Sequence, residues 1–181
     1  ACERRGGVHD RHGDAREPRD AGDLRRGQLQ RRSSSGATTS PACPTCLWNR
    51  SITLSALANG TVRIGSDAGN LTITAPIVQT NTNTAVTKVG EGDLQYNASN
   101  TYTGLTTVNE GTLRVTNASA LGTVAAGTVV NAGAELDLDG TPGTLTMAAE
   151  ALTLNGDGLT PGRAGALNNV VGNNTWTGSV T

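Results

Sequence analysis

A short phrase recurs through residues 51–181 and limits the folds that this part of the chain can adopt. Each copy has a glycine, one or two small or polar residues, a leucine, one polar residue and then an apolar residue. The clearest copies are GNLTIT (69–74), GDLQYN (92–97), GTLRVT (111–116) and GAELDLD (133–139), with looser relatives in GTVRIG (60–65) and EALTLNG (150–156). The leading leucines lie 23, 19, 23 and 16 residues apart, at Leu71, Leu94, Leu113, Leu136 and Leu152. Imperfect self-similarity with a period of about 20 residues indicates a solenoid.

The alternation of apolar and polar residues within each copy is the spacing of a β-strand. In GTLRVT, Leu113 and Val115 face one side while Arg114 faces the other. A second phrase, TTVNEG (106–111), recurs as TVVNAG (128–133). Helical repeats need apolar spacings of three and four, and leucine-rich repeats need about three leucines around an asparagine, so neither class fits. Two or three strands per circuit, bent at glycine and asparagine, predict a parallel β-helix.

The predicted core is thin and aliphatic, because the chain has no Phe and only two Tyr and two Trp. Each buried side chain contributes roughly 1.5–3 kcal/mol, so we expect backbone pairing between circuits to supply much of the remaining stability. The stability of a solenoid is a sum over neighbouring repeats, so an uncapped end costs stability. No capping segment is evident in residues 51–181, and we interpret them as part of a longer array. The inward set is Val62, Ile64, Leu71, Ile73, Leu94, Tyr96, Leu113, Val115, Val130, Leu136, Leu138, Leu152 and Leu154.

Residues 1–50 differ sharply in composition from residues 51–181. They hold ten arginines and six acids, against four Lys or Arg and nine acids in the rest, so the two parts carry charges of about +4 and −5. Large apolar residues are few and scattered in residues 1–50, which we therefore predict to be a disordered Arg/Gly-rich segment. The alternative is that this segment is GC-rich DNA read in the wrong frame and not a genuine coding region.

Two sharper interpretations of residues 1–50 compete with a solvated tail. A C-x-x-C pair and two upstream histidines have ligand types that suit zinc, but about thirty residues of featureless chain separate the two pairs. The arginine pairs at 25–26 and 31–32 suit nucleic acid or acidic lipid, but interleaved acids dilute their field. We favour the solvated tail and predict no nucleic-acid partner. The four candidate zinc ligands are His9, His12, Cys43 and Cys46.

One acidic stripe is the best catalytic or metal-binding candidate in residues 51–181. Glu135, Asp137 and Asp139 alternate with leucines, so all three carboxylates share the outer face of one strand. Outward carboxylates on a β-helix can bind calcium or act as acid and base. No Arg, Lys or His is evident nearby in the sequence, and we favour a solvated acidic face.

The other candidate sites are weaker. The segments 66–69 and 156–158 each offer one Asp, which is too little for a calcium-binding turn. Trp176 fits a core or groove residue better than a platform for sugars. We therefore predict no catalytic, cofactor-binding or metal-binding residue, no cofactor, and a function that is not enzymatic.

The order of motifs from Lys88 to Gly122 resembles the autotransporter-associated β-strand repeat, also called the passenger-associated transport repeat. That family runs K-x-G-x-G-x-L-x-L, then N-T-Y-T-G, then T-x-V-x-x-G-T-L-x-V, then a short A-L-G. This chain has KVGEGDL (88–94), NTYTG (100–104), TTVNEGTLRV (106–115) and ALG (120–122), with looser matches in 129–138, 165–167 and NNTWTG (173–178). The resemblance implies a right-handed parallel β-helix in a large secreted or surface-anchored bacterial protein, with no catalytic residues. It covers roughly residues 60–181.

These observations together predict a structural passenger or stalk segment of an autotransporter-like protein that supports transport across the outer membrane and surface display. The expected location is the cell surface or the extracellular space, with the signal and the anchor outside these residues, since no apolar run reaches the roughly 18 residues of a membrane helix. The expected partners are neighbouring repeats of the parent chain. Two alternatives remain open: an adhesin-type module that binds glycans or host matrix proteins, and a polysaccharide-cleaving β-helix enzyme.

Overall fold

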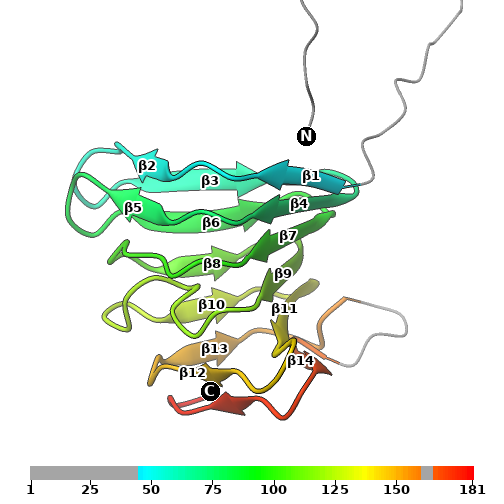
Figure 1. Ribbon diagram of the computed structural model, residues 1–181. Coiled ribbons are helices and arrows are strands. Elements are labelled where there is room, and N and C mark those ends of the chain that lie inside the picture. Colours follow the sequence, from blue (N-terminus) through cyan, green and yellow to red (C-terminus); the bar gives the residue numbers. More distant parts are fainter. Residues whose placement is uncertain (1–44, 160–164) are drawn as a thin grey trace, which may run out of the picture. The chain divides into compact units, whose positions relative to one another are not determined.

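The computed structural model describes residues 45–159 and 165–181, and its strands run parallel and stack in sequence order (Figure 1). The described residues contain no helix, and none of them forms an apolar helix of membrane-spanning length. The strands are β1 (Thr45–Trp48), β2 (Ile52–Leu54), β3 (Thr61–Gly65), β4 (Asn70–Ile73), β5 (Ile77–Gln79), β6 (Ala85–Val89), β7 (Asp93–Tyr96), β8 (Thr106–Val108), β9 (Gly111–Val115), β10 (Thr128–Val130), β11 (Ala134–Asp139), β12 (Thr146–Met147), β13 (Leu152–Leu154), β14 (Leu167–Val171) and β15 (Thr175–Trp176).

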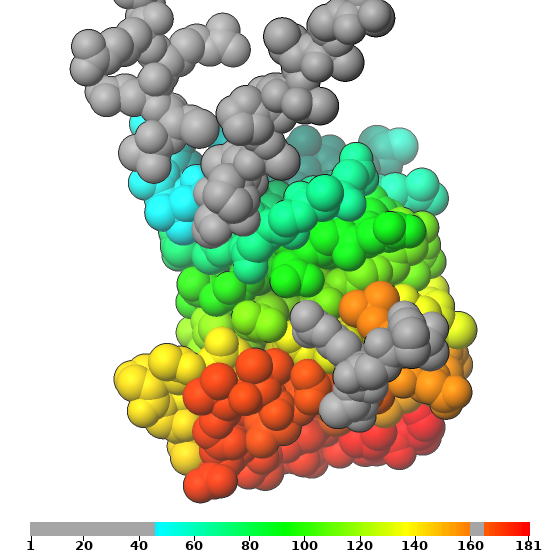
Figure 2. Space-filling view, turned by 90° about the vertical axis from the view of Figure 1, so that its right-hand side faces the viewer, coloured from blue at the N-terminus to red at the C-terminus, as the bar shows by residue number. Residues whose placement is uncertain are grey.

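Three faces of parallel sheet surround a common core. The first face is a six-stranded sheet in the order β1-β4-β7-β9-β11-β14, and the second is a five-stranded sheet in the order β13-β10-β8-β6-β3. The third face holds the short pairs β2-β5 and β12-β15. The described residues thus wind through about five circuits of a β-solenoid, and successive circuits form layers (Figure 2). We call each circuit a coil, with the first over residues 45–65, the second over 70–89, the third over 93–108, the fourth over 111–130 and the fifth over 134–154.

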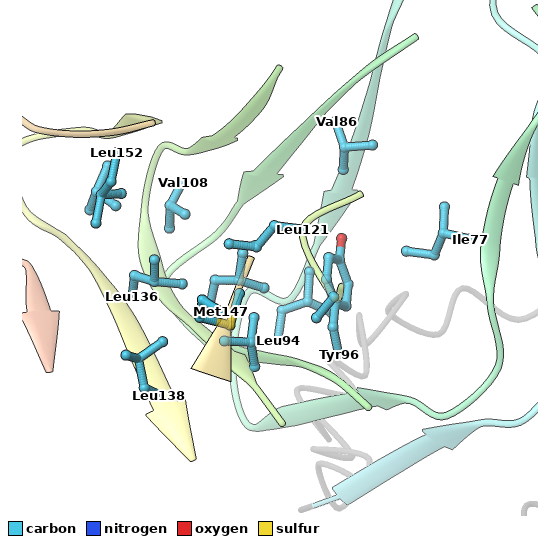
Figure 3. Close-up of a cluster of buried hydrophobic side chains, with 14 of the residues drawn as sticks. Ile77, Val86, Leu94, Tyr96, Val108, Leu121, Leu136, Leu138, Met147 and Leu152 are labelled. Carbon is cyan, nitrogen blue, oxygen red and sulfur yellow. The ribbon is translucent and has the colours of Figure 1, made fainter. Parts of the chain in front are cut away.

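Four of the five recurrent leucines occupy one column of the core, on the first sheet. Leu152 lies on β13 of the second sheet, opposite Thr128, so the looser copies EALTLNG and GTVRIG are not equivalent to the other copies. Leu71 pairs in register with Leu94, Leu94 with Leu113, and Leu113 with Leu136. The unequal spacing of these leucines is absorbed by loops of different length between strands. All thirteen residues of the predicted inward set either are buried or pack against the buried cluster, several of them labelled in Figure 3. The parallel β-helix that the sequence predicted is therefore confirmed.

The core is larger than the alternating pattern revealed. Residues on the third face, where strands are short, are also buried, and Ile77, Leu121 and Met147 lie between the strands in Figure 3. Tyr102 is buried too, although residues 100–104 form no regular strand. Their backbone still continues the stack, because Thr101 N–H donates to Ile77 O (3.0 Å) and Thr123 N–H donates to Tyr102 O (2.9 Å).

The first sheet begins before the boundary that the sequence placed at residue 50. β1 pairs with β4, so that Cys46 lies opposite Leu71 and Trp48 lies opposite Ile73. Among the described strands, β1 is at the edge of this sheet and pairs with β4. Residues 1–44, the rest of the segment predicted to be disordered, lie outside the described residues.

A test of the core uses Leu113, whose side chain is fully buried in the leucine column. Leu113→Ala removes apolar contacts and leaves a cavity, so we expect the free energy of unfolding to fall by about 2–5 kcal/mol in urea titrations followed by circular dichroism. Thr107→Ala is the matched control, because this half-buried residue points outward from β8, and its effect should stay within about 0.5 kcal/mol. Equal losses for the two variants would contradict the assignment of inside and outside.

Candidate functional site

A buried lysine bonds to the turn between β6 and β7; we call such turns between successive coils corners. Lys88 stands in an inward column, in register with Ile64 and Val108. Although it is a charged residue, it is only 1% exposed. Its Nζ donates hydrogen bonds to three carbonyl oxygens, those of Gly90, Gly92 (2.6 Å) and Glu110 (2.8 Å). Two of these acceptors belong to the corner of its own coil and the third to the corner of the next coil. Lys88 therefore joins the second coil to the third.

The side chain of Glu110, which lies in the next corner between β8 and β9, bonds back to this corner. Its Oε2 accepts a hydrogen bond from Gly90 N–H at 2.7 Å. Burial lowers the pKa of the Lys88 amine, while the negative charges of Asp93, Glu110 and Asp67 oppose that shift. We call Lys88 and Glu110 the corner pair, since each reaches the backbone of the other's coil.

Two glycines permit the close approach of these corners. Gly90 has a φ of 80°, and a Cβ there would lie 2.5 Å from Ser66 O in the first coil. Gly111 has a φ of 61°, and a Cβ there would lie 2.6 Å from Gly90 O. Both positions combine a left-handed backbone with contact to the preceding coil, which only glycine accommodates without strain. The glycines of the K-x-G-x-G and G-T-L motifs therefore serve the stacking of coils.

Asn100, the first residue of N-T-Y-T-G, links three successive coils. Its Oδ1 accepts from Ile77 N–H in the second coil at 2.8 Å. Its Nδ2 donates to Ala120 O in the fourth coil at 2.5 Å, and its own N–H donates to Ser119 O at 2.9 Å. The side chain is 4% exposed, so these bonds replace hydration that burial removes.

The remaining residues of N-T-Y-T-G make contacts of the same kind. Tyr102 places its hydroxyl 2.8 Å from Thr106 Oγ1, which donates to Leu121 O (3.0 Å) in the fourth coil. Thr103 Oγ1 accepts from Gln79 Nε2 (2.8 Å) in the second coil. A Cβ at Gly104 would overlap the backbone of the second coil. Each position of the motif therefore contacts a neighbouring coil.

A second copy of this motif occupies the equivalent place after the fifth coil. Asn174 Oδ1 accepts from Leu145 N–H at 2.8 Å, as Asn100 does from Ile77. Trp176 replaces Tyr102: it is half-buried against the core, and its Nε1 donates to Glu150 O at 3.0 Å. This placement agrees with the expectation that Trp176 is a core or groove residue.

The structure changes the interpretation of the acidic stripe. Glu135 and Asp137 point outward from β11 but are 0% exposed, so the expected solvated acidic face is wrong for these two residues. Asp137 Oδ2 lies 2.9 Å from Arg114 of the neighbouring strand, and its Oδ1 accepts from Asn168 Nδ2 at 3.1 Å. The sequence hid this basic partner because Arg114 is 23 residues away along the chain and becomes adjacent only through the register of β9 with β11.

Asp139, the third acid of the stripe, and the two aspartates considered for calcium-binding turns do not come together in one site. Asp139 is half-buried and accepts from Thr141 Oγ1 at 2.6 Å. Asp67 and Asp157 lie in exposed corners. Within residues 45–159 and 165–181, no three His, Cys, Asp or Glu side chains are placed to hold a metal ion. Of the candidate zinc ligands, only Cys46 falls among the described residues, and it is exposed on β1.

Glu150 carries a buried carboxyl group that the sequence pattern did not predict. Glu150 is 3% exposed and its Oε1 accepts from Thr128 Oγ1 at 2.6 Å in the fourth coil. Burial raises the pKa of Glu150 to about 7, although the Thr128 hydrogen bond acts in the opposite sense. No periodic signal marks this residue, because it lies between strands and becomes internal only through the stacking of coils.

Residues 86–115 match the family model described as Passenger-associated-transport-repeat. The chain therefore carries a repeat of this family. The match begins on β6, includes the corner pair and the whole of N-T-Y-T-G, and ends with β9. It confirms the resemblance found in the sequence, and in this chain most of the motif residues of the repeat bind one coil to the next. Searches of curated proteins and of solved structures returned no match.

Asn100 provides a test of the transport repeat. Asn100→Ala leaves the Ile77 amide and the Ala120 carbonyl buried without their partner, and each orphaned group costs about 1–3 kcal/mol. We expect urea titrations to show a loss of at least that size. Asn155→Ala is the control, because Asn155 is exposed and its loss should be close to neutral. A neutral effect of Asn100→Ala would contradict the described linkage.

Glu150 predicts an unusual dependence of stability on pH. A carboxyl group whose pKa is higher in the folded state than its unfolded value of 4.5 stabilises the fold fully below pH 4.5, and this contribution is lost as pH rises through about 7. We expect the free energy of unfolding to fall by up to about 3 kcal/mol over that window. Glu150→Gln keeps an acceptor for Thr128 but cannot ionise, so its urea titrations between pH 5 and 8 should show a smaller fall. Identical pH profiles would refute the assignment.

Proposed function

We propose that this chain is a structural passenger segment of a secreted or cell-surface bacterial protein, which supports transport across the outer membrane and is displayed outside the cell as a β-solenoid stalk. The observation that carries the proposal is the transport repeat at residues 86–115 in a solenoid whose motif positions contact neighbouring coils. The function is mechanical and not enzymatic: the repeat makes its contacts to backbone groups and to polar side chains of adjacent coils.

The geometry also supplies a mechanism for folding outside the cell. A completed coil presents unpaired N–H and C=O groups along the edges of its strands, and the next coil pairs with them in parallel. Asn100 and the corner pair add side-chain contacts that form only when the neighbouring coil is in place. Folding can therefore proceed coil by coil and retain the chain on the outer side.

A display assay tests this proposal. The chain is fused to an outer-membrane translocator, and surface exposure is measured by protease accessibility on intact cells. We expect the unmodified chain to reach the surface, and the double variant Leu113→Asp with Val115→Asp, which places two charges in the core, to be retained and degraded. Thr107→Asp, which adds one charge on the outer face of β8, is the control and should be displayed.

Two results would count against the passenger role. The first is surface display of the double aspartate variant at the level of the unmodified chain, which would separate folding from transport. The second is failure of the unmodified chain to be displayed. Binding of the displayed chain to glycan arrays or matrix proteins would instead favour the adhesin alternative.

A further inference from the structure

A chain built from similar repeats can stack its coils in the wrong order. β8 and β10 carry the phrases TTVNEG (106–111) and TVVNAG (128–133), and they pair with each other so that Thr106 lies opposite Thr128 and Val108 opposite Val130. If β10 took the place of β8 against β6 and one coil were skipped, the same inward residue types would meet the second coil. Backbone pairing and apolar packing alone discriminate weakly between these two arrangements.

The two phrases differ in the residue that follows their shared asparagine. The native phrase has Glu110 at this position, whereas the competing phrase has Ala132. Glu110 gives the second coil both a carbonyl oxygen for Lys88 and a carboxylate oxygen for the Gly90 N–H. In the skipped arrangement, Ala132 could offer a carbonyl oxygen but no carboxylate. The buried lysine would lose a compensating charge, and the Gly90 N–H would lose its acceptor.

We propose that the corner pair fixes the stacking register, by favouring the third coil over the fourth as the next neighbour of the second. This role differs from simple stabilisation. A lysine placed in an aliphatic column costs desolvation, and replacing a buried charged network with apolar side chains is often neutral or stabilising. Buried polar groups are best attested as devices that select one register among similar alternatives, at some cost in stability.

The register can be read directly with pairs of cysteines on the outer face of the second sheet. Thr87 lies opposite Thr107 in the native stack, and Val129 lies one strand further on. Adjacent strands are about 4.8 Å apart, within the range that a disulfide bridges, whereas two strand spacings are about 9–10 Å and too far. A Thr87→Cys, Thr107→Cys chain thus reports native stacking, and a Thr87→Cys, Val129→Cys chain reports the skipped coil. The three native cysteines are replaced by serine in this background.

Each reporter chain is refolded from urea and then oxidised, and disulfide-linked peptides are quantified by mass spectrometry. In the parent background we expect the 87–107 link and almost no 87–129 link. Lys88→Met and Glu110→Ala should each raise the 87–129 link by at least about tenfold. Glu91→Ala is the matched control, since this exposed acid belongs to the same corner region and should leave both yields unchanged.

An 87–129 yield that stays at the parental level in both variants would overturn the proposal, whatever happens to the thermal unfolding midpoint. Glu110→Ala keeps the lysine and the core column intact, so it decides the matter if Lys88→Met does not fold. Loss of both links in both variants would show that the pair is required for folding as a whole, and would overturn a role in register selection.

Discussion

Each coil of the solenoid satisfies its backbone hydrogen bonds on the coils before and after it, and the other features of the structure follow from this constraint. Parallel pairing runs through every coil from β1 to β14, and it continues across residues 100–104 where no regular strand forms. Because coils pair along the whole circuit, the backbones of successive corners must lie close together. This close approach requires glycine at positions such as Gly90, where a side chain would meet the preceding coil.

Buried polar side chains connect neighbouring coils in addition to the aliphatic columns. Lys88, Asn100 and Glu150 are buried, and each bonds to a neighbouring coil with a different partner. Interior polar groups are costly when unmatched, so a set that differs from one coil to the next penalises incorrect stacking. The transport repeat concentrates two of these residues within 86–115. Its motif residues in this chain therefore make contacts between coils, as expected for the proposed passenger segment that folds progressively.

The fold could be predicted from the sequence because a strand period of two within a repeat of about 20 residues leaves few alternatives. The leucine column and the inward set follow from that alternation alone. The site contacts could not be predicted in the same way. Lys88 occupies an apolar position, Glu150 lies outside any strand, and the ion pair between Arg114 and Asp137 depends on a register that links residues 23 apart. Such contacts appear only once the length of each loop has fixed which coil positions face each other.

Backbone amide hydrogen exchange by NMR on the full chain tests the stacked register most directly. The account predicts slow exchange for strand amides from β4 to β11, and equally slow exchange for the Ile77 amide, whose acceptor is the side chain of Asn100 one coil away. The Gly90 amide, bound to Glu110, should be slower than other corner amides. Fast exchange at Ile77 and Gly90, with protection confined to isolated strands, would contradict a solenoid in which these side chains join successive coils.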